Sequence, residues 1–319
     1  MVTIDLITGF LGSGKTTFLK KYAEYLMDQG LHIGILENDF GAINVDMLML
    51  HELRGDQCEL EMIAGGCDAE SHRRRFRTKL ISMRMCGYDR VLVEPSGIYD
   101  VDEFFDVLRE EPLDQWYEIG NVITILDARL EDNLSEQADY LLASEAANAG
   151  KVILSHADAA TREQCEDTVA HLNRALEQIR CDRRIDTKKD ILQKNLTDLT
   201  KEDLEEVSKC GYRLESYRKM DLENRQSFDS LFFMEEKIKP EALERAVPRL
   251  FADKSCGEVF RIKGFVKNGA GQWMELNATP DSHTMQPVAV GQEVLIVIGE
   301  HLQEDKIREI LKEEETCQS

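Results

Sequence analysis

Short apolar runs alternate with amphipathic stretches along the amino-terminal part of the chain. Each run has five to eight residues and is rich in β-branched side chains, which is typical of strands buried on both faces of a parallel sheet. The stretches between the runs carry apolar residues at helical spacing. This alternation predicts βαβ units and an α/β fold with a mostly parallel sheet flanked by helices. The predicted strands are residues 3–8, 32–37, 90–94, 121–128 and 151–155.

Two of the predicted helices have recognisable ends. The first begins at Thr16, and Gly30 stands where a glycine commonly closes a helix, because glycine adopts the left-handed conformation at low cost. The second has Thr200 as its N-cap, Asp203 three residues later and Gly211 at its end. These signals place one helix directly after the first strand. They place the other helix near the end of the amino-terminal part, before the pattern of apolar and polar residues changes.

The carboxyl-terminal part of the chain has a different pattern, which predicts a second domain. A polar stretch rich in lysine and glutamate covers residues 186–226, and we place the junction at residues 212–227. Beyond it, a helix starts near Pro240, and proline is favoured in a first helical turn. Two strands around a glycine-rich turn, a further strand and a closing amphipathic helix predict a small α+β domain. The predicted domains are residues 1–211 and 228–319.

Composition narrows the classes of function. The 319 residues fit two domains, and the excess of 61 acidic over 39 basic side chains gives a net charge of −22. Such a chain repels phosphate backbones, so we expect no nucleic-acid partner. We expect no membrane partner either, because no apolar run approaches the roughly 20 residues of a span and no signal peptide is evident. The eight cysteines form no CxxC pair, which favours a reducing cytoplasm over a disulfide scaffold.

Residues 9–16, GFLGSGKT, form the clearest chemical motif. The motif fits GxxxxGK[ST] and lies between a predicted strand and a predicted helix, as a phosphate-binding loop requires. Glycines let the backbone N–H groups curl around phosphates, and the following helix adds its positive dipole end. Lys15 would reach the β- and γ-phosphates, and the Thr16 hydroxyl would bind Mg²⁺. The predicted nucleotide-binding residues of this loop are Gly9, Gly12, Ser13, Gly14, Lys15, Thr16 and Thr17.

A second strand end supplies a carboxylate for the metal. In YDRVLVEPSG, Glu94 follows a buried-strand pattern and Gly97 comes three residues later. Glu94 would hold Mg²⁺ or a water bound to it. The N–H of Gly97 would face the γ-phosphate and respond to its loss on hydrolysis. Together with Thr16, Glu94 is therefore the predicted Mg²⁺ ligand, and Lys15 and Glu94 are candidate catalytic residues.

A third strand end predicts which base is bound. VILSHAD, residues 152–158, ends in Asp158, whose carboxylate can accept two hydrogen bonds from guanine. Adenine lacks this pair of donors, and a charged hydrogen bond contributes about 1.5–3 kcal/mol, so Asp158 can discriminate. GTPases usually carry NKxD here, whereas this chain has Ser155 and His156 in place of asparagine and lysine. We therefore expect these three residues to bind the base with a weakened preference for GTP.

The combined motifs resemble those of one family, the CobW-type GTPases, which are related to HypB and UreG. The resemblance covers nearly the whole chain. In the amino-terminal part it rests on the phosphate-binding loop, on ENDFGAINVD at residues 37–46 and on EPSG at residues 94–97. In the carboxyl-terminal part it rests on FRIKGFVK at residues 260–267 and VLIVIG at residues 294–299. The loop alone marks a superfamily, and its combination with FRIKG is much more specific.

The resemblance implies a metallochaperone-like protein with GTP as its substrate and Mg²⁺ as its cofactor. Such proteins couple GTP binding and hydrolysis to delivery of zinc, cobalt or a corrinoid cofactor of the cobalamin type to a client metalloprotein. The resemblance places Asn38, Asp39 and Gly41 in the first switch segment, with the Asp39 carboxylate as a third catalytic candidate that faces Mg²⁺ or a transferred metal. No glutamine or arginine finger is evident, so we expect slow turnover that a client, a GTP-dependent homodimer partner or a metal would accelerate.

The segment AGGCDAESH, residues 64–72, stands where the family carries a C-x-C-C motif. Cys67 matches its first cysteine, whereas Ala69 and Glu70 replace the other two. A mixed set of sulfur, oxygen and nitrogen donors would suit Zn²⁺ or Co²⁺ weakly. A metal-free switch loop is the alternative interpretation. The candidate donors for a transferred metal are Cys67, Asp68, Glu70 and His72 with Glu37 from the switch.

Two other functions remain open at this point. A GTP-dependent switch or chaperone for a metalloenzyme, which carries no ion itself, agrees with the loss of two cysteines. A P-loop ATPase or kinase with relaxed base specificity agrees with SHAD in place of NKxD. The run Arg73–Arg75 opposes a nearby cation and could pair instead with nucleotide phosphate or with carboxylates of a client.

Overall fold

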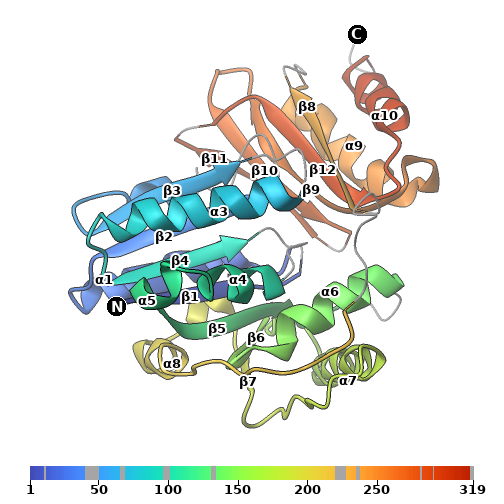
Figure 1. The fold of residues 1–319 in the computed structure, drawn as a ribbon. Coiled ribbons are helices and arrows are strands. Elements are labelled where there is room, and N and C mark those ends of the chain that lie inside the picture. The colour runs from blue at the N-terminus through green and yellow to red at the C-terminus, as the bar shows by residue number, and fades with distance from the viewer. Residues whose placement is uncertain are drawn as a thin grey trace. The chain divides into compact units, whose positions relative to one another are not determined.

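The computed structural model of the chain has two compact units, Met1–Met220 and Asp221–Ser319 (Figure 1). Among the described helices, none combines the length and the apolar character that crossing a bilayer requires. The structure describes residues 1–10, 12–39, 50–64, 69–95, 101–130, 134–219, 228–234, 238–280, 282–289 and 291–316.

The first unit is built around a seven-stranded sheet in the order β3-β2-β4-β1-β5-β6-β7, in which all neighbouring strands are parallel (Figure 1). The predicted α/β fold with a parallel sheet is confirmed, and the five predicted strands correspond to β1, β2, β4, β5 and β6. The pattern of apolar runs misses the two edge strands, β3 and β7. Because an edge strand is only partly buried, β3 alternates apolar and charged residues in CELEMIA. The strands are β1 Val2–Thr8, β2 Ile33–Asp39, β3 Cys58–Ala64, β4 Arg90–Pro95, β5 Tyr117–Asp127, β6 Lys151–Ser155 and β7 Ile191–Gln193.

Helices cover both faces of this sheet. Phe18 and Tyr22 from α1 and Leu204 from α8 pack with strand residues in one buried core. On the opposite face, α3 and α4 lie in front of the sheet in the view of Figure 1. The helices are α1 Lys15–Asp28, α3 Ala69–Arg84, α4 Val101–Leu108, α5 Leu113–Trp116, α6 Glu136–Ala147, α7 Arg162–Gln178 and α8 Lys201–Val207, with short 3₁₀ turns at His51–Leu53 and Leu196–Asp198.

The predicted helix ends can be compared with the observed ones. α1 starts at Lys15 rather than Thr16, and Gly30 follows its C-cap with a φ of 84°, as predicted. At α8, Thr200 is the N-cap and forms a capping box with Asp203, which confirms that prediction. This helix ends at Val207, so Gly211 belongs to the segment after it and does not close the helix.

The chain beyond α8 stays attached to the first unit. The backbone N–H of Arg213 donates to the carbonyl of Asn148 at 2.9 Å, and that of Arg218 donates to the carbonyl of Ile179 at 2.7 Å. The predicted junction at residues 212–227 therefore begins inside the first unit, and the division between the units falls later within that range.

The second unit contains a five-stranded antiparallel sheet in the order β11-β10-β9-β12-β8. Two helices, α9 and α10, pack with it around one hydrophobic core that includes Leu250, Ile262, Val297 and Ile310. The predicted α+β fold of this part is confirmed, and Pro240 is the first residue of α9. The elements are β8 Phe228–Met234, α9 Pro240–Ala252, a 3₁₀ turn at Lys254–Cys256, β9 Glu258–Lys267, β10 Trp273–Thr279, β11 Ser282–Val288, β12 Val294–Glu300 and α10 Glu304–Thr316.

Candidate nucleotide site

The loop between β1 and α1 has a backbone that favours glycine at three positions, Gly9, Gly12 and Gly14. Gly9 has a φ of 141°, and a Cβ atom there would lie 2.0 Å from the carbonyl oxygen of Ile125 on β5. Gly14 has a φ of 95° and forms the N-cap of α1 in the left-handed conformation. A side chain would be strained at either position. The glycines of the motif are therefore required by the close approach of the loop to the sheet.

The amino end of α1 is open to an anion. Gly14 provides no side-chain cap, and the first turn contains no acidic residue. By contrast, Ser135, Thr161 and Thr200 cap α6, α7 and α8 with side-chain oxygens that accept a backbone N–H. The first N–H groups of a helix have no intrahelical acceptor, and the helix dipole is positive at this end. The amino end of α1 thus offers the donors and the charge that phosphate binding requires.

Lys15 is folded back over the loop. Its Nζ donates to the carbonyl oxygen of Gly9 at 2.8 Å and to that of Phe10 at 3.4 Å, and the residue is only 7% exposed. Ser13 is also buried, and its Oγ has no hydrogen-bond partner among the described residues. The Lys15 ammonium and the Ser13 hydroxyl therefore both lie within the loop that would surround a triphosphate. There they can form hydrogen bonds to phosphate oxygens.

Two buried carboxylates lie side by side at the ends of β2 and β4. Glu37 and Glu94 are paired in the parallel register and are 3% and 4% exposed. The hydroxyl of Thr16, in the first turn of α1, donates to Oε1 of Glu94 at 2.8 Å. Adjacent buried carboxylates repel each other unless a cation or a proton relieves them. Because Mg²⁺ prefers oxygen ligands, Thr16 and Glu94 fit the predicted Mg²⁺ site, and Glu37 adds a third oxygen donor nearby.

Asn38 continues this edge of the sheet. It follows Glu37 on β2, pairs with Pro95 in the register and is fully buried. Neither its Oδ1 nor its Nδ2 has a hydrogen-bond partner within the described part of the chain. Nearly all buried side-chain amides in native proteins are hydrogen-bonded, so the amide of Asn38 is a candidate ligand contact at this edge.

Glu145 on α6 is a site residue that the sequence analysis misses. Its carboxylate is fully buried near the Thr8 hydroxyl and the backbone N–H of Gly9, both of which favour its ionised form. Burial raises the pKa of Glu145 to about 8, although the positive charge of Lys15 acts in the opposite direction. Glu145 therefore lies close enough to the phosphate-binding loop to act on its lysine. In the sequence, Glu145 could have been noticed only as a single acidic residue among small and apolar ones in LLASEAA.

The predicted base-binding residues lie at the carboxyl end of β6. Ser155 is buried, and its Oγ donates to the carbonyl of Leu126 at 3.3 Å. His156 has a φ of 52° and begins a turn in which its carbonyl accepts from the N–H of Ala159 at 3.1 Å. Asp158 is exposed in this turn. Its carboxylate is thus accessible to a base at this end of the sheet.

Asp127 holds His156 in place and is a second residue that the sequence analysis misses. Nδ1 of His156 lies 2.8 Å from Oδ2 of Asp127, and Arg129 pairs with the same carboxylate at 3.1 Å. Burial opposes the ionisation of Asp127, but the hydrogen bonds from His156 and Arg129 outweigh burial and lower its pKa to about 2. Asp127 is the last residue of β5, and its carboxylate follows a buried-strand pattern as that of Glu94 does. The reasoning that selected Glu94 from the sequence would therefore also have selected Asp127.

The predicted metal donors Glu70 and His72 lie on different sides of α3. The helix begins at Ala69, so both residues belong to the helix rather than to a loop. Helical residues two positions apart do not share a face. Glu70 is exposed, whereas His72 is 0% exposed with its Nδ1 3.5 Å from Oε1 of Glu103 on α4. The two side chains do not converge on one ion, and no group of three potential metal ligands occurs in the ranges that the structure describes.

Other predicted site residues fall outside the described residues. Asp39 ends β2 with its backbone, and its side chain is not described. The proposed roles of the residues in the undescribed ranges therefore stay predictions from the sequence. These residues are Gly41, Cys67, Asp68 and Gly97.

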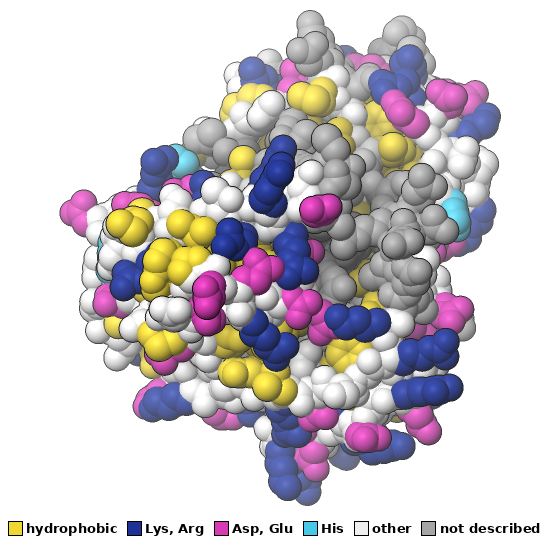
Figure 2. Space-filling model, in the orientation of Figure 1, with side chains coloured by type: hydrophobic (Ala, Val, Ile, Leu, Met, Phe, Trp, Pro, Cys, Tyr) yellow, Lys and Arg dark blue, Asp and Glu magenta, His cyan; other side chains and the backbone are white. Residues whose placement is uncertain are grey.

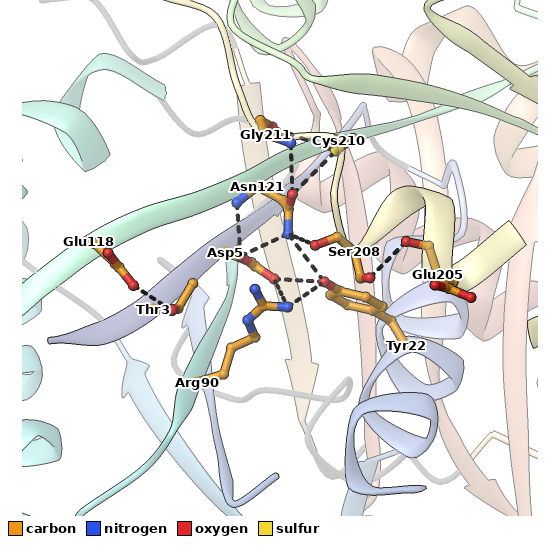
Figure 3. Close-up of polar contacts among 10 residues, drawn as sticks. All are labelled: Thr3, Asp5, Tyr22, Arg90, Glu118, Asn121, Glu205, Ser208, Cys210 and Gly211. Atoms are coloured by element: carbon orange, nitrogen blue, oxygen red, sulfur yellow. Dashed lines mark hydrogen bonds and ion pairs between the residues drawn. The ribbon is translucent and has the colours of Figure 1, made fainter. Parts of the chain in front are cut away.

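A second buried polar cluster lies farther along α1 (Figure 3). Asp5 on β1 accepts from the Tyr22 hydroxyl and from the backbone N–H of Asn121, both at 2.8 Å. Arg90 lies 3.5 Å from the Asp5 carboxylate and donates to the Tyr22 hydroxyl at 3.2 Å. The side-chain oxygen of Asn121 accepts from the N–H of Gly211 at 2.8 Å. The cluster ties α1 to three strands and to the segment after α8.

Both parts of the chain match models of protein families. Residues 3–186 match the nucleotide-binding domain of CobW/HypB/UreG proteins. Residues 229–314 match the carboxyl-terminal domain of the cobalamin synthesis protein CobW. The two matches agree with the two units of the structure in order and in kind.

Curated relatives and solved structures were also compared with the chain. It is 29% identical over 185 residues to the zinc chaperone YjiA of Escherichia coli, which covers 54% of this chain and 55% of that protein. It is 24% identical over 166 residues to the zinc-regulated GTPase metalloprotein activator 1 of Schizosaccharomyces pombe, which covers 49% of this chain and 37% of that protein. The chain therefore spans about half, or less, of the length of these relatives. The crystal structure of Zn(II)-bound YjiA GTPase from E. coli aligns over 98% of both chains with 16% identity and a TM-score of 0.38.

Proposed function

We propose, because this chain belongs to the CobW/HypB/UreG family of nucleotide-binding proteins, that it binds GTP with Mg²⁺ and hydrolyses it to drive delivery of a metal to a client protein. One observation carries the proposal. The uncapped amino end of α1 begins with Lys15 and Thr16, and Thr16 contacts Glu94, which is paired with Glu37. This arrangement of oxygen donors beside an uncapped helix end suits a magnesium-bound triphosphate.

Hydrolysis would proceed by attack of water on the γ-phosphorus. The bond from that atom to the β–γ bridging oxygen breaks, and its electrons leave with GDP. Lys15 would exchange the carbonyls of Gly9 and Phe10 for β- and γ-phosphate oxygens. Bound Mg²⁺, held by Thr16 and Glu94, would neutralise phosphate charge. The chain's contribution is thus positioning and electrostatic stabilisation, with Asp39 and Gly97 in the switch roles predicted from the sequence.

The base preference would come from the turn after β6. Asp158 would accept from guanine, and His156, held by Asp127, would replace the lysine that flanks the base in other GTPases. An imidazole fixed by a carboxylate keeps its position without the long flexible stem of lysine. We therefore propose a preference for GTP over ATP that is weaker than in proteins with NKxD.

The names of the relatives support zinc as the first cargo to test. Two of them are a zinc chaperone and a zinc-regulated GTPase metalloprotein activator. Cobalt or a corrinoid cofactor is the second choice, since the carboxyl-terminal unit matches a domain of a cobalamin synthesis protein. We place the client, a metalloprotein, in the reducing cytoplasm, and the free thiols of Cys58 and Cys165 support this compartment. A GTP-dependent homodimer is part of the proposal.

A second candidate function is a GTP switch that serves a metalloenzyme without carrying an ion. The divergence of Glu70 and His72 on α3 favours it, because Cys67 then lacks two of its expected co-ligands. The two functions differ in whether the chain itself binds the cargo metal.

The test combines nucleotide and metal titrations. Calorimetry with Mg²⁺ should show heat for GTP and less affinity for ATP, and phosphate release should be slow. Equal affinity for both nucleotides would favour a P-loop ATPase or kinase, and no heat for either would reject the proposal. Zn²⁺ affinity should fall in Cys67→Ala and stay unchanged in Cys86→Ala, which removes an exposed thiol elsewhere in the chain. If both variants bind Zn²⁺ like the parent, the metal-free switch is the better function.

A further inference from the structure

β3 is an edge strand whose outer backbone is open within the described structure. It stands first in the seven-stranded sheet and pairs only with β2 among the described strands. An open edge exposes N–H and C=O groups that can pair with another chain, and charged side chains often guard it. Here Glu61 pairs with Lys79 at 2.8 Å, and Glu59 accepts a hydrogen bond from the Tyr88 hydroxyl. Both acids are thus engaged by neighbouring elements of the same unit.

A groove of about 500 Å³ lies between β3 and α3. Met62 contributes apolar surface, since its residue is 38% exposed. Figure 2 shows dark blue basic, yellow hydrophobic and some magenta acidic side chains over the region of α3. The groove therefore combines apolar contact with positive charge. Its lining includes Met62 and Ile63 from β3 and Arg74, Arg75, Thr78 and Lys79 from α3.

The consecutive arginines of α3 face different partners. Arg73 pairs with Glu110 at 2.6 Å, and Arg77 pairs with the same carboxylate at 3.0 Å. Arg74 and Arg75 are exposed on the groove. In the described structure, Arg74 hydrogen-bonds through its backbone carbonyl, which accepts from the Thr78 hydroxyl at 2.8 Å. Positive charge concentrated on one groove is unusual for a chain with a net charge of −22.

We propose that β3 and α3 form a docking groove for an extended acidic segment of a partner protein, which adds a strand to β3 and places carboxylates against Arg74 and Arg75. Strand addition supplies backbone hydrogen bonds, and alternate side chains supply specificity. Arginine suits carboxylates because its planar fork can bind them through two parallel hydrogen bonds.

The place of the groove in the chain connects it to the nucleotide site. In the sequence, residues 65–68 join β3 to α3 and contain Cys67, so the groove is built from the two elements that flank the predicted metal-binding segment. The identification of the partner as the client rests on the proposed function, whereas the groove and its charge do not. A second copy of this chain suits the groove less well, because pairing two β3 strands would bring their arginines together.

A short fluorescein-labelled peptide of alternating valine and glutamate tests the groove. Fluorescence anisotropy at low salt should show binding of this peptide and none of the matched peptide of alternating valine and lysine. The double variant Arg74→Glu, Arg75→Glu should weaken binding at least about tenfold, because attraction becomes repulsion. The control variant Arg162→Glu, Arg184→Glu makes the same change of charge at exposed residues outside the groove and should bind like the parent.

Two further measurements separate strand addition from charge alone. A peptide N-methylated at alternate residues cannot complete the backbone ladder and should lose binding, whereas equal binding would overturn the strand assignment. Unchanged binding in the groove variant, or equal loss in the control variant, would overturn the docking site. Light scattering that shows a dimer broken only by the groove variant would assign the groove to a second copy instead, against the proposal.

Nucleotide titration of the same variants keeps the two proposals distinct. If the groove variant binds GTP like the parent but the acidic peptide fails with every protein, the docking groove alone is rejected. If the parent binds the peptide but no nucleotide, the proposed function is rejected and the groove stands.

Discussion

Two buried polar clusters lie under the same helix, and they differ in how completely their hydrogen bonds are made. Around Tyr22, the carboxylate of Asp5, the side chain of Asn121 and the guanidinium of Arg90 bond to one another (Figure 3). At the proposed nucleotide site, the hydroxyl of Ser13 and the side-chain amide of Asn38 have no hydrogen-bond partner among the described residues. One cluster is closed on itself, and the other leaves polar atoms open.

The difference indicates what each cluster is for. Burial raises the pKa of Asp5, although Arg90, Tyr22 and Asn121 act to lower it, so this carboxylate depends on its partners for its place in the core. Such a satisfied network fixes the packing of the elements that it joins. Open polar atoms in a buried site cost stability and are retained where a ligand completes them. The first cluster is therefore structural, and the second agrees with the proposed nucleotide site.

The largest expected effect is on the closed cluster. Asp5→Ala should lower the free energy of unfolding by about 3–5 kcal/mol, because it leaves Arg90 and the amide of Asn121 without their buried acceptor. For a unit of this size, the midpoint of thermal unfolding should fall by roughly 6–20 °C. Denaturant unfolding measures the effect, and Asp182→Ala, at an exposed position, is the control. GTP affinity of the folded protein should be unchanged, and a large loss of affinity would show that the clusters are not separate.

Lys15→Ala tests the open cluster. It should weaken GTP binding roughly 100-fold or more, since a charged hydrogen bond to phosphate contributes about 1.5–3 kcal/mol and Lys15 can make two. Fluorescent GTP titration with Mg²⁺ measures the change. Lys20→Ala, which removes a lysine of the same helix that pairs with Glu52, should bind like the parent. If Lys15→Ala bound GTP normally, the loop would not be the nucleotide site.

Glu145→Gln tests the buried carboxylate of α6 through the pH dependence of folding stability. The folded protein holds the Glu145 carboxyl with a pKa of about 8 against an ordinary value of 4.5, so folding favours its protonated form. A raised carboxyl pKa contributes its full stability below about pH 4.5 and loses it progressively as the pH rises towards 8. The amide cannot ionise, so the variant should be more stable than the parent at pH 8, by about 4 kcal/mol, and within about 1 kcal/mol of it at pH 5.

Thermal unfolding at the two pH values measures this difference. Glu136→Gln changes an exposed acid on the same helix and should show no such dependence on pH. A variant that is equally stabilised at both pH values would mean that packing, rather than ionisation, limits stability at this position.

The smallest expected effect is at the base. Asp158→Asn should weaken GTP binding roughly tenfold and leave ATP binding nearly unchanged, because one charged acceptor for guanine becomes a neutral amide. Competition between the two nucleotides measures the ratio. Asp167→Asn, on the exposed face of α7, is the control. A parallel loss for ATP would assign Asp158 to the fold rather than to base recognition.

The fold was predictable where its signals are local. Apolar runs identify the buried strands of the sheet, and the capping residues identify the starts of helices. Strand β3 escapes this argument because an edge strand alternates apolar and charged residues over a short length. Local signals also could not predict the position of His72. Its closeness in sequence to Cys67 suggests a shared site, whereas α3 places His72 in the core beside Glu103.

The sequence by itself determined the phosphate-binding loop, because its glycines, lysine and threonine are contiguous and act through backbone geometry that they specify locally. Only the tertiary structure decided which distant residues meet it. The sheet brings together strands that are not neighbours in the chain, so Glu37 lies beside Glu94, and α6 carries Glu145 to the loop. The same packing separates Arg73 from Arg74 and leaves a groove beside β3. A pattern read along one chain specifies the conformation of each element, but the side chains that meet in space depend on how all the elements pack.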